Sequence, residues 1–151
     1  MNIRHMINCN FCLENKTLRG RILAQDDFCY IVESIDPVLR HAVMIITKRH
    51  IETPFELSEQ EWLSIKKYLI EAEKILSKTN PDGFIVGWNV RETAGQRVSH
   101  AHLHVVARFS DEPLAGKGIC YFFKQETNKR QPQKKVLEGG GAGQLKQGNI
   151  A

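Results

Sequence analysis

The sequence predicts an α+β domain in which a mostly antiparallel, five-stranded sheet is covered by one long helix. Three observations favour this class. Short apolar runs of strand length recur along the chain and are separated by polar turns. One longer segment repeats its apolar residues at helical spacing. A third stretch alternates histidines with apolar residues, as expected of a strand with one functional face.

The apolar runs place the strands. The polar turn Gln25-Asp26-Asp27 lies between two such runs and indicates a hairpin. The run Ala42-Val43-Met44-Ile45-Ile46-Thr47 has no polar alternation, which is typical of a central strand covered on both faces. Strands are expected at residues 18–23, 28–34, 42–47 and 84–90 and along the histidine segment.

The helix is expected from Ser58 to Ser77. Ser58 and Glu61 have the spacing of a capping box, in which each side chain bonds the other residue's backbone N–H. The segment Thr79-Asn80-Pro81-Asp82-Gly83 is expected to end the helix. The apolar positions, which we expect to pack in the core, are Trp62, Ile65, Leu69, Ala72, Ile75 and Leu76.

Chain length and charge distribution indicate how many domains the protein has and which partners are excluded. A chain of 151 residues suits one domain. Residues 1–123 hold 15 Lys and Arg against 15 Asp and Glu, whereas residues 124–151 hold six against two. The net charge of +4 therefore comes from the end of the chain, and a neutral domain argues against a nucleic-acid partner. We expect a domain at 1–123 with a short C-terminal extension, and a flexible basic Gly- and Gln-rich tail at 124–151.

The amino end has no continuous apolar stretch, and no later run is long enough to cross a bilayer. We therefore expect a cytoplasmic protein without a membrane partner. In such a chain, four cysteines favour metal ligands or buried thiols over disulfides. Cys29 and Cys120 each lie in an apolar run, and we expect both in the core.

The histidine segment Gly95-Gln-Arg-Val-Ser-His-Ala-His-Leu-His-Val-Val-Ala-Arg-Phe109 has the highest concentration of reactive side chains. In a strand, His100, His102 and His104 share one face. Three interpretations are open. The histidines can be a solvated face, a metal site, or an anion site where one imidazole attacks phosphorus and its neighbours hold the oxygens.

The run His100-Ala-His-Leu-His-Val-Val106 resembles the signature of the histidine triad (HIT) family of nucleotide hydrolases and transferases. The resemblance covers residues 9–109 and implies a HIT-like fold and a homodimer. It also implies a catalytic set of His102, His104 and His100, with His102 as the nucleophile that attacks the α-phosphate of a bound nucleotide. The expected substrates are dinucleoside polyphosphates or nucleoside phosphoramidates.

The loop before the triad is expected to bind substrate phosphates. Gly95 allows close backbone approach, and Asn89 and Gln96 supply side-chain donors. Arg97 departs from the family, which commonly has a small hydroxyl residue there. We expect its guanidinium to reach an extra phosphate of a polyphosphate substrate. The family's histidine before the central strand is also missing, because Ala42 stands at that position; His41 is one residue away and is expected to be a turn residue.

The pair in Cys9-Asn10-Phe11-Cys12 can be a redox couple, plain structural thiols or metal ligands. By resemblance to zinc-bearing relatives, Cys9, Cys12, His50 and His100 would hold a structural Zn²⁺ with no position open to water.

Two other functions remain open. The three histidines can instead be ligands of a catalytic metal with an open position for water. The chain can also be a nucleotide-binding interaction protein whose turnover is incidental.

Overall fold

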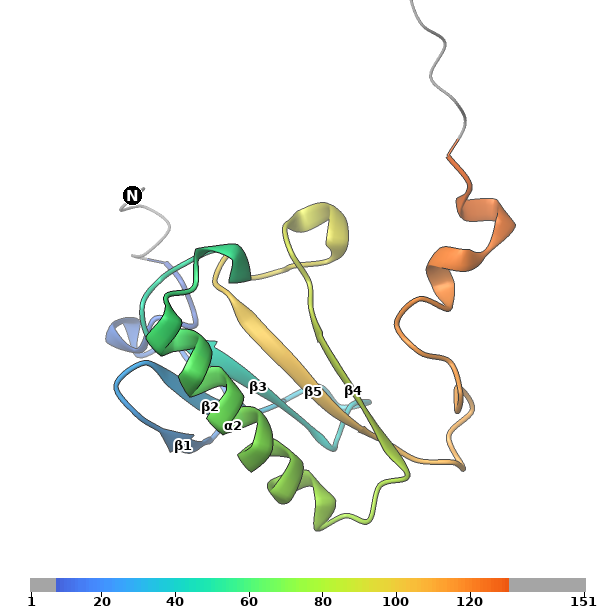
Figure 1. The fold of residues 1–151 in the computed structure, drawn as a ribbon, viewed down its shortest axis with the longest axis horizontal. Coiled ribbons are helices and arrows are strands. Elements are labelled where there is room, and N and C mark those ends of the chain that lie inside the picture. Colours follow the sequence, from blue (N-terminus) through green and yellow to red (C-terminus); the bar gives the residue numbers. More distant parts are fainter. Residues whose placement is uncertain (1–7, 131–151) are drawn as a thin grey trace, which may run out of the picture. The chain divides into compact units, whose positions relative to one another are not determined.

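The structure is a computed structural model that describes residues 8–130. The chain divides into two compact units, Met1–Cys120 and Tyr121–Ala151. The first unit contains the sheet and the helix (Figure 1). Its elements are η1 (Leu13–Asn15), β1 (Ile22–Gln25), β2 (Cys29–Glu33), β3 (Ala42–Thr47), η2 (Pro54–Glu56), α2 (Glu59–Ser77), β4 (Gly83–Trp88), η3 (Glu92–Ala94) and β5 (His102–Arg108).

The sheet has five antiparallel strands in the order β1-β2-β3-β5-β4. The central strand was predicted with its observed bounds, and it lies in the middle of the sheet. The first strand was predicted too early, at 18–23. Gly20 has φ +95°, and a Cβ there would meet the Glu33 carbonyl oxygen at 2.5 Å, so the chain turns here and pairing begins only at Ile22. The α+β prediction is confirmed.

Helix α2 lies across one face of the sheet (Figure 1). Its capping box is formed as predicted: Ser58 Oγ accepts from the Glu61 N–H, and Glu61 Oε2 accepts from the Ser58 N–H. The prediction for Trp62 is wrong, because 55% of this residue is exposed. Trp62 lies on the flank of the helix nearest β4, at the rim of the sheet, rather than over its centre. The buried side chains facing the sheet are Ile65, Tyr68, Ala72 and Leu76.

The other face of the sheet carries the histidines. Leu103 and Val105 pack in the core under α2, so His102 and His104, which alternate with them, point to the opposite face. We call this the triad face. Strand β5 begins at His102, which corrects the prediction that all three histidines share a strand. His100 lies in a bend two residues earlier and is completely buried.

In the second unit, the described residues form two short 3₁₀ turns, η4 (Phe122–Lys124) and η5 (Glu126–Asn128). The predicted tail at 124–151 lies mostly outside the described residues. Cys120, predicted to be buried, is exposed because it lies beyond the last strand on a surface segment. Within residues 8–130, no helix is long and apolar enough to span a membrane.

Candidate active site and metal centre

The bend before β5 separates the three histidines into two environments. The His100 Nε2–H donates to the Thr47 carbonyl oxygen at 2.7 Å. Because a carbonyl can only accept, the proton is on Nε2 and the lone pair is on Nδ1. His100 Nδ1 faces the two cysteines near the amino end, with Cys9 Sγ at 3.4 Å. Burial lowers the pKa of His100 to about 4, so its ring is neutral.

His102 has the opposite arrangement. Its Nδ1–H donates to the carbonyl oxygen of His100 at 2.7 Å. The lone pair is therefore on Nε2, the ring atom farthest from the backbone. Burial lowers the pKa of His102 below its usual value, which keeps the imidazole neutral. An imidazole in this state, with its lone pair on Nε2, has the chemistry that a nucleophile needs.

Two rings flank His102. His104 lies on one side, with ring centroids 4.9 Å apart, and burial lowers its pKa as well. Phe11 lies on another side, with its centroid 5.1 Å from that of His102 and the rings nearly perpendicular. Phe11 belongs to an apolar cluster on the triad face, over β2 and β3, that includes Leu13 and Ile22. The nucleophile candidate thus has an apolar wall on the β2–β3 side.

The four predicted metal ligands lie together. The candidate ligand atoms of Cys9, Cys12, His50 and His100 are all within 4.8 Å of one another. Cys12 Sγ lies 3.3 Å from His50 Nδ1 and 3.7 Å from His100 Nδ1. Neighbouring ligand atoms of a tetrahedral zinc are about 3.5 Å apart. Two sulfurs and two imidazole nitrogens at this spacing fit zinc.

The surroundings of this cluster also suit a cation. Burial and the neighbouring Cys9 raise the pKa of Cys12 to about 12, so the Cys12 thiol is costly to ionise without a positive charge beside it. The Phe11 N–H donates to Cys9 Sγ. Thr47 fixes the tautomer of His100, as a second layer of contacts does in metal sites. These residues would hold a structural ion that ties the amino end to β3 and β5.

Arg49 fixes the segment that carries His50. Its guanidinium donates to both carboxylate oxygens of Glu61, at 2.8 and 2.7 Å. Glu61 is 3% exposed and also caps α2. The residue before the candidate metal ligand His50 is therefore anchored to the start of the helix.

The loop between β4 and β5 holds the predicted substrate residues. Gln96 fastens this loop: its Oε1 accepts from the Arg91 N–H, and its Nε2 donates to the Glu52 carbonyl oxygen. Both ends of its amide are thus bonded within the protein. Gly95 has φ +88°, a conformation that favours glycine. A Cβ at Gly95 would lie 3.9 Å from Asn89 Nδ2, so the Asn89 amide is close to this exposed turn.

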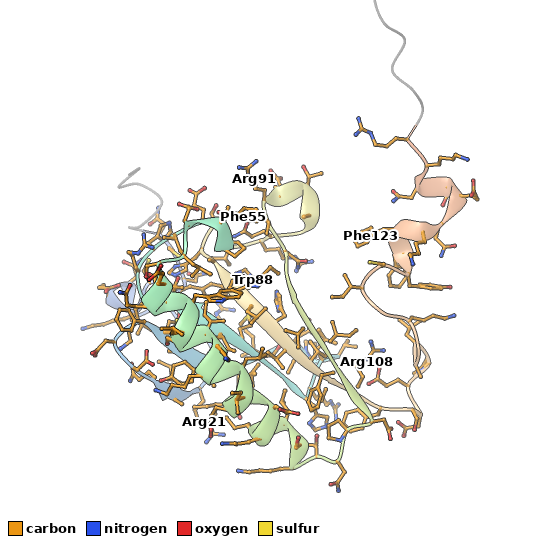
Figure 2. All side chains as sticks on the ribbon, viewed as in Figure 1. Arg21, Phe55, Trp88, Arg91, Arg108 and Phe123 are labelled. Carbon is orange, nitrogen blue, oxygen red and sulfur yellow. The ribbon has the colours of Figure 1, made fainter. Side chains whose placement is uncertain are left out.

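Two arginines stand beside a polar hollow of about 440 Å³ at this loop. Arg97 and Arg91 are both exposed, and Arg91 extends at the top of Figure 2. Arg97 also contributes to lowering the pKa of Asp36, after the larger effect of the Leu39 and Val38 N–H groups. The positive charge of Arg97 therefore acts on the β2–β3 loop, which contains Asp36. The lining residues are Arg91, Glu92, Gly95, Gln96, Arg97 and Ser99.

The sequence did not single out two of these features. Phe11 stands in the sequence only as a spacer between two cysteines, and its contact with His102 depends on the long-range approach of the amino end. Arg91 carries no sequence pattern.

Comparison with known proteins identifies the family. Residues 15–111 match the HIT domain. An uncharacterized HIT-like protein of Methanocaldococcus jannaschii is 25% identical over 69% of this chain and 81% of its own length. An adenylylsulfatase of Arabidopsis thaliana is 28% identical over 67% of this chain and 52% of its own length. The solved structure of a HIT family hydrolase from Clostridium thermocellum is 27% identical, with a TM-score of 0.57, over 70% of this chain and 95% of that one.

The chain therefore belongs to the HIT domain family, a superfamily of nucleotide-binding proteins and hydrolases. Its five-stranded antiparallel sheet with one helix across it is the HIT-like fold.

Proposed function

We propose that this protein is a hydrolase or nucleotidyl transferase that acts on the α-phosphate of dinucleoside polyphosphates or nucleoside phosphoramidates. The observation that supports this most directly is the 2.7 Å hydrogen bond from His102 Nδ1 to the His100 carbonyl oxygen. It leaves Nε2 of a neutral imidazole as the reactive atom on the triad face.

In the proposed reaction, His102 Nε2 forms a bond to the α-phosphorus, and the bond from phosphorus to the leaving group breaks. The leaving group departs with the electron pair and takes up a proton. Water then attacks the nucleotidyl-histidine, which releases the nucleotide and restores the neutral ring. Splitting one displacement into two easier steps is the purpose of covalent catalysis.

Other residues hold the phosphate. His104 lies beside His102, and the Asn89 amide offers a donor at the neighbouring loop. The Gly95 N–H bonds the Glu92 carbonyl oxygen, so this glycine contributes the shape of the turn. Gln96 acts mainly by holding that loop in shape, since both ends of its amide bond protein groups. Cys9, Cys12, His50 and His100 would hold a structural Zn²⁺, which supplies a cross-link. In this proposal His100 has two roles. Its carbonyl oxygen orients the His102 ring, and its own ring faces the proposed metal site.

The three-histidine metal site fits the geometry less well. His100 Nδ1 faces Cys9 and Cys12, whereas His102 presents Nε2 on the triad face. Among the described residues, the cluster of possible ligands contains His100 but neither His102 nor His104.

Replacement of the nucleophile tests the proposal. His102→Ala should lower kcat by at least about a thousandfold with a dinucleoside tetraphosphate and with a phosphoramidate, since each tenfold loss is about 1.4 kcal/mol of barrier. His41→Ala is the control, because His41 is exposed and contacts Phe109 at the far end of β5. Full turnover by His102→Ala would refute the covalent mechanism. Tight nucleotide binding without turnover by the wild type would favour an interaction protein.

A substitution at Arg97 tests which of the two substrate classes the protein prefers. If its guanidinium contacts a phosphate beyond the α-phosphate, Arg97→Ser should raise KM for the tetraphosphate about tenfold and leave the phosphoramidate nearly unchanged. Steady-state kinetics on both substrates provide the measurement. Equal effects on both would show that Arg97 contacts no additional phosphate.

We further propose that the chain forms a homodimer through β4. This strand is an edge of the sheet and leaves Phe84 and Val86 36% and 41% exposed. Next to it, Trp62 and Trp88 line an apolar groove of about 250 Å³ between α2 and β4. Figure 2 shows Trp88 between the helix and the sheet. An apolar edge of this kind suits pairing with a second copy.

A further inference from the structure

The segment after β5 turns back toward the triad face. Residues 113–120, which we call the C-terminal strap, leave the end of β5 and return along β4. Ile119 Cδ1 comes within 3.0 Å of the place where a Cβ on Gly87 would stand. Any larger residue at this position of β4 would press on the strap.

Gly87 is the strand neighbour of His104. The two residues are directly paired between β4 and β5, so their side-chain directions share a face. That face is the triad face. Ile119 therefore lies above β4 on the triad face, at the position that is paired with His104, and His102 is two residues before His104 on the same face. About half of Ile119 is exposed, as expected of a side chain that forms a wall.

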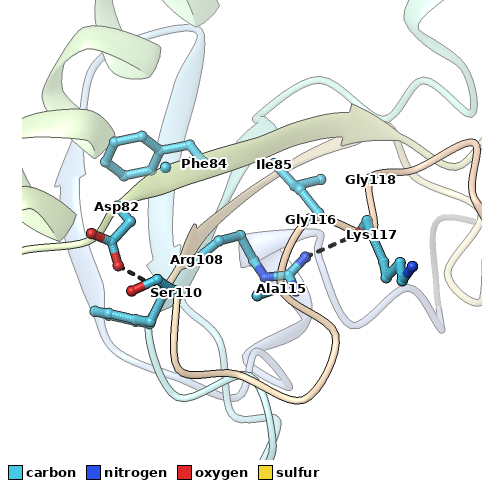
Figure 3. Close-up of a pocket in the computed structure, with 11 residues that line it drawn as sticks. Asp82, Phe84, Ile85, Arg108, Ser110, Ala115, Gly116, Lys117 and Gly118 are labelled. Carbon is cyan, nitrogen blue, oxygen red and sulfur yellow. Dashed lines mark hydrogen bonds between the residues drawn. The ribbon is translucent and has the colours of Figure 1, made fainter.

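Arg108 holds the strap in this place. Its Nε donates to Glu112 Oε2 at 2.7 Å, and one of its terminal nitrogens donates to the Leu114 carbonyl oxygen at 3.1 Å. The other terminal nitrogen reaches the Lys117 carbonyl oxygen at 3.5 Å, as the dashed line in Figure 3 shows. Glu112 also accepts from the Phe109 N–H. The path of the strap is thus set at the end of β5.

Between these two attachments the strap arches over a hollow of about 440 Å³ (Figure 3). Arg108 points into this region, where Glu112 and two carbonyl oxygens accept hydrogen bonds from its guanidinium. Residues 115–118 of the strap line one side of this hollow, and Ile119 follows them directly. Gly116, with φ +74°, supplies a turn within the C-terminal strap.

The two sides of the triad face differ in chemistry. Phe11 and its apolar neighbours cover the β2–β3 side of His102 and suit a nucleoside base, which packs on aromatic and apolar surfaces. In the proposed reaction the α-phosphate lies at His102 Nε2. With the base on the β2–β3 side of His102, the leaving group extends to the other side, toward β4 and the strap.

We propose that the strap forms the leaving-group side of the catalytic cleft and that Ile119 limits the size of the leaving group. Ile119 is a specificity-determining residue, and Arg108 is the positioning residue that holds it. The inference rests on the proposed function, because it takes the reacting phosphate to be at His102.

The test compares two adenosine phosphoramidates that differ only in the amine, one made with methylamine and one with naphthylmethylamine. Ile119→Ala should raise kcat/KM for the bulky compound about tenfold and change that for the small one by less than about twofold. Leu114→Ala is the matched control, because Leu114 is exposed on the same strap and Arg108 contacts only its carbonyl oxygen. An unchanged ratio between the two compounds in Ile119→Ala would overturn the proposal.

A double-mutant cycle tests the contact itself. Gly87→Ala should press on Ile119 and lower kcat/KM for the bulky compound, but it should have little effect in the Ile119→Ala background. Residues in contact show such non-additivity. Additive effects would mean that Ile119 does not form the wall above Gly87.

Binding separates this inference from the proposed function. In a His102→Ala background, calorimetry with the same two compounds should show that Ile119→Ala tightens binding of the bulky one alone. If His102→Ala retains turnover, the covalent mechanism fails, and the affinity ratio still decides whether Ile119 is a wall. If His102→Ala abolishes turnover but Ile119→Ala changes neither the kcat/KM ratio nor the affinity ratio of the two compounds, the covalent mechanism stands and the role of Ile119 is refuted.

Discussion

At His102, one hydrogen bond to the backbone decides which ring nitrogen can react. The acceptor is the carbonyl of His100, whose own ring is turned toward two cysteines. A single residue therefore connects the metal centre to the nucleophile candidate. Phe11 makes a second connection, since its N–H bonds Cys9 Sγ and its ring contacts His102. If Cys9, Cys12, His50 and His100 bind a metal as proposed, removing it should change the position of the His102 ring.

The metal ligands can be tested without any activity assay. Cys12→Ser should reduce the zinc bound per chain and lower the melting temperature by about 5 °C or more, because a structural zinc contributes directly to folding. Elemental analysis of the purified protein and thermal unfolding give the two readouts. Cys120→Ser, a change at an exposed cysteine, should leave both unaltered. Equal zinc content in Cys12→Ser and wild type would exclude Cys12 as a ligand.

Single residues also show what the sequence could reveal of the site. The alternation of histidines and the Cys-x-x-Cys spacing point to the residues that the fold brings together. Their orientations do not follow from spacing, because the bend at His100 depends on Thr47, which is distant in sequence. The sequence also does not show that Gln96 holds its own loop in shape, since the carbonyl oxygen that it bonds belongs to Glu52, 44 residues away.

At the scale of elements, the strongest patterns were predicted best. The central strand and α2 were correct because a continuous apolar run and a complete capping box are unambiguous. The first strand was predicted to begin too early because Leu18 was grouped with Ile22 and Leu23 in one run. Only the close approach of Gly20 to Glu33 shows where pairing begins. Trp62 fits the helical period but lies at the rim of the sheet, which periodicity alone does not reveal.

Asp26 joins the β1–β2 turn to α2. Burial alone would raise its pKa, but hydrogen bonds from the Cys29 and Phe28 N–H groups, Lys67 and Ser64 lower the pKa to about 2. A carboxyl group with a depressed pKa in the fold contributes stability above its unfolded pKa of about 4. That contribution is lost as the pH falls from about 4 to about 2.

Asp26→Asn should therefore destabilise the fold by about 1 kcal/mol at pH 7, a modest value because a quarter of the side chain is exposed. The difference from wild type should vanish near pH 2. Urea unfolding over a pH series measures it, with Asp27→Asn, a change at the exposed neighbour, as control. A difference that does not depend on pH would mean that the carboxylate charge is not responsible.

At the scale of the whole molecule, the two edges of the sheet are unequal. Strand β1 is short and irregular, with a register shift between Ile22 and Ala24. Strand β4 is longer and borders the apolar groove under Trp62. The strap lies along this same strand on the triad face, so the proposed dimer edge and the proposed leaving-group wall are neighbours. The oligomeric state and substrate selectivity should consequently be linked.

The dimer is tested at the edge strand. Val86→Lys places a charge on the exposed side of β4 and should shift the protein from two chains to one at equal concentration. Light scattering coupled to gel filtration provides the mass. Val38→Lys is the control, because Val38 is 85% exposed on the β2–β3 loop. A wild type with the mass of one chain would contradict the dimer.

The central claim is that His102 carries the nucleotide during turnover. Wild-type protein and His102→Ala should each be mixed with a diadenosine tetraphosphate, quenched in alkali within the first turnover, and weighed intact by mass spectrometry. We expect an added mass of one adenylyl group on the wild type and none on the variant. An adduct on His102→Ala, or turnover by the wild type with no adduct at any time, would contradict it.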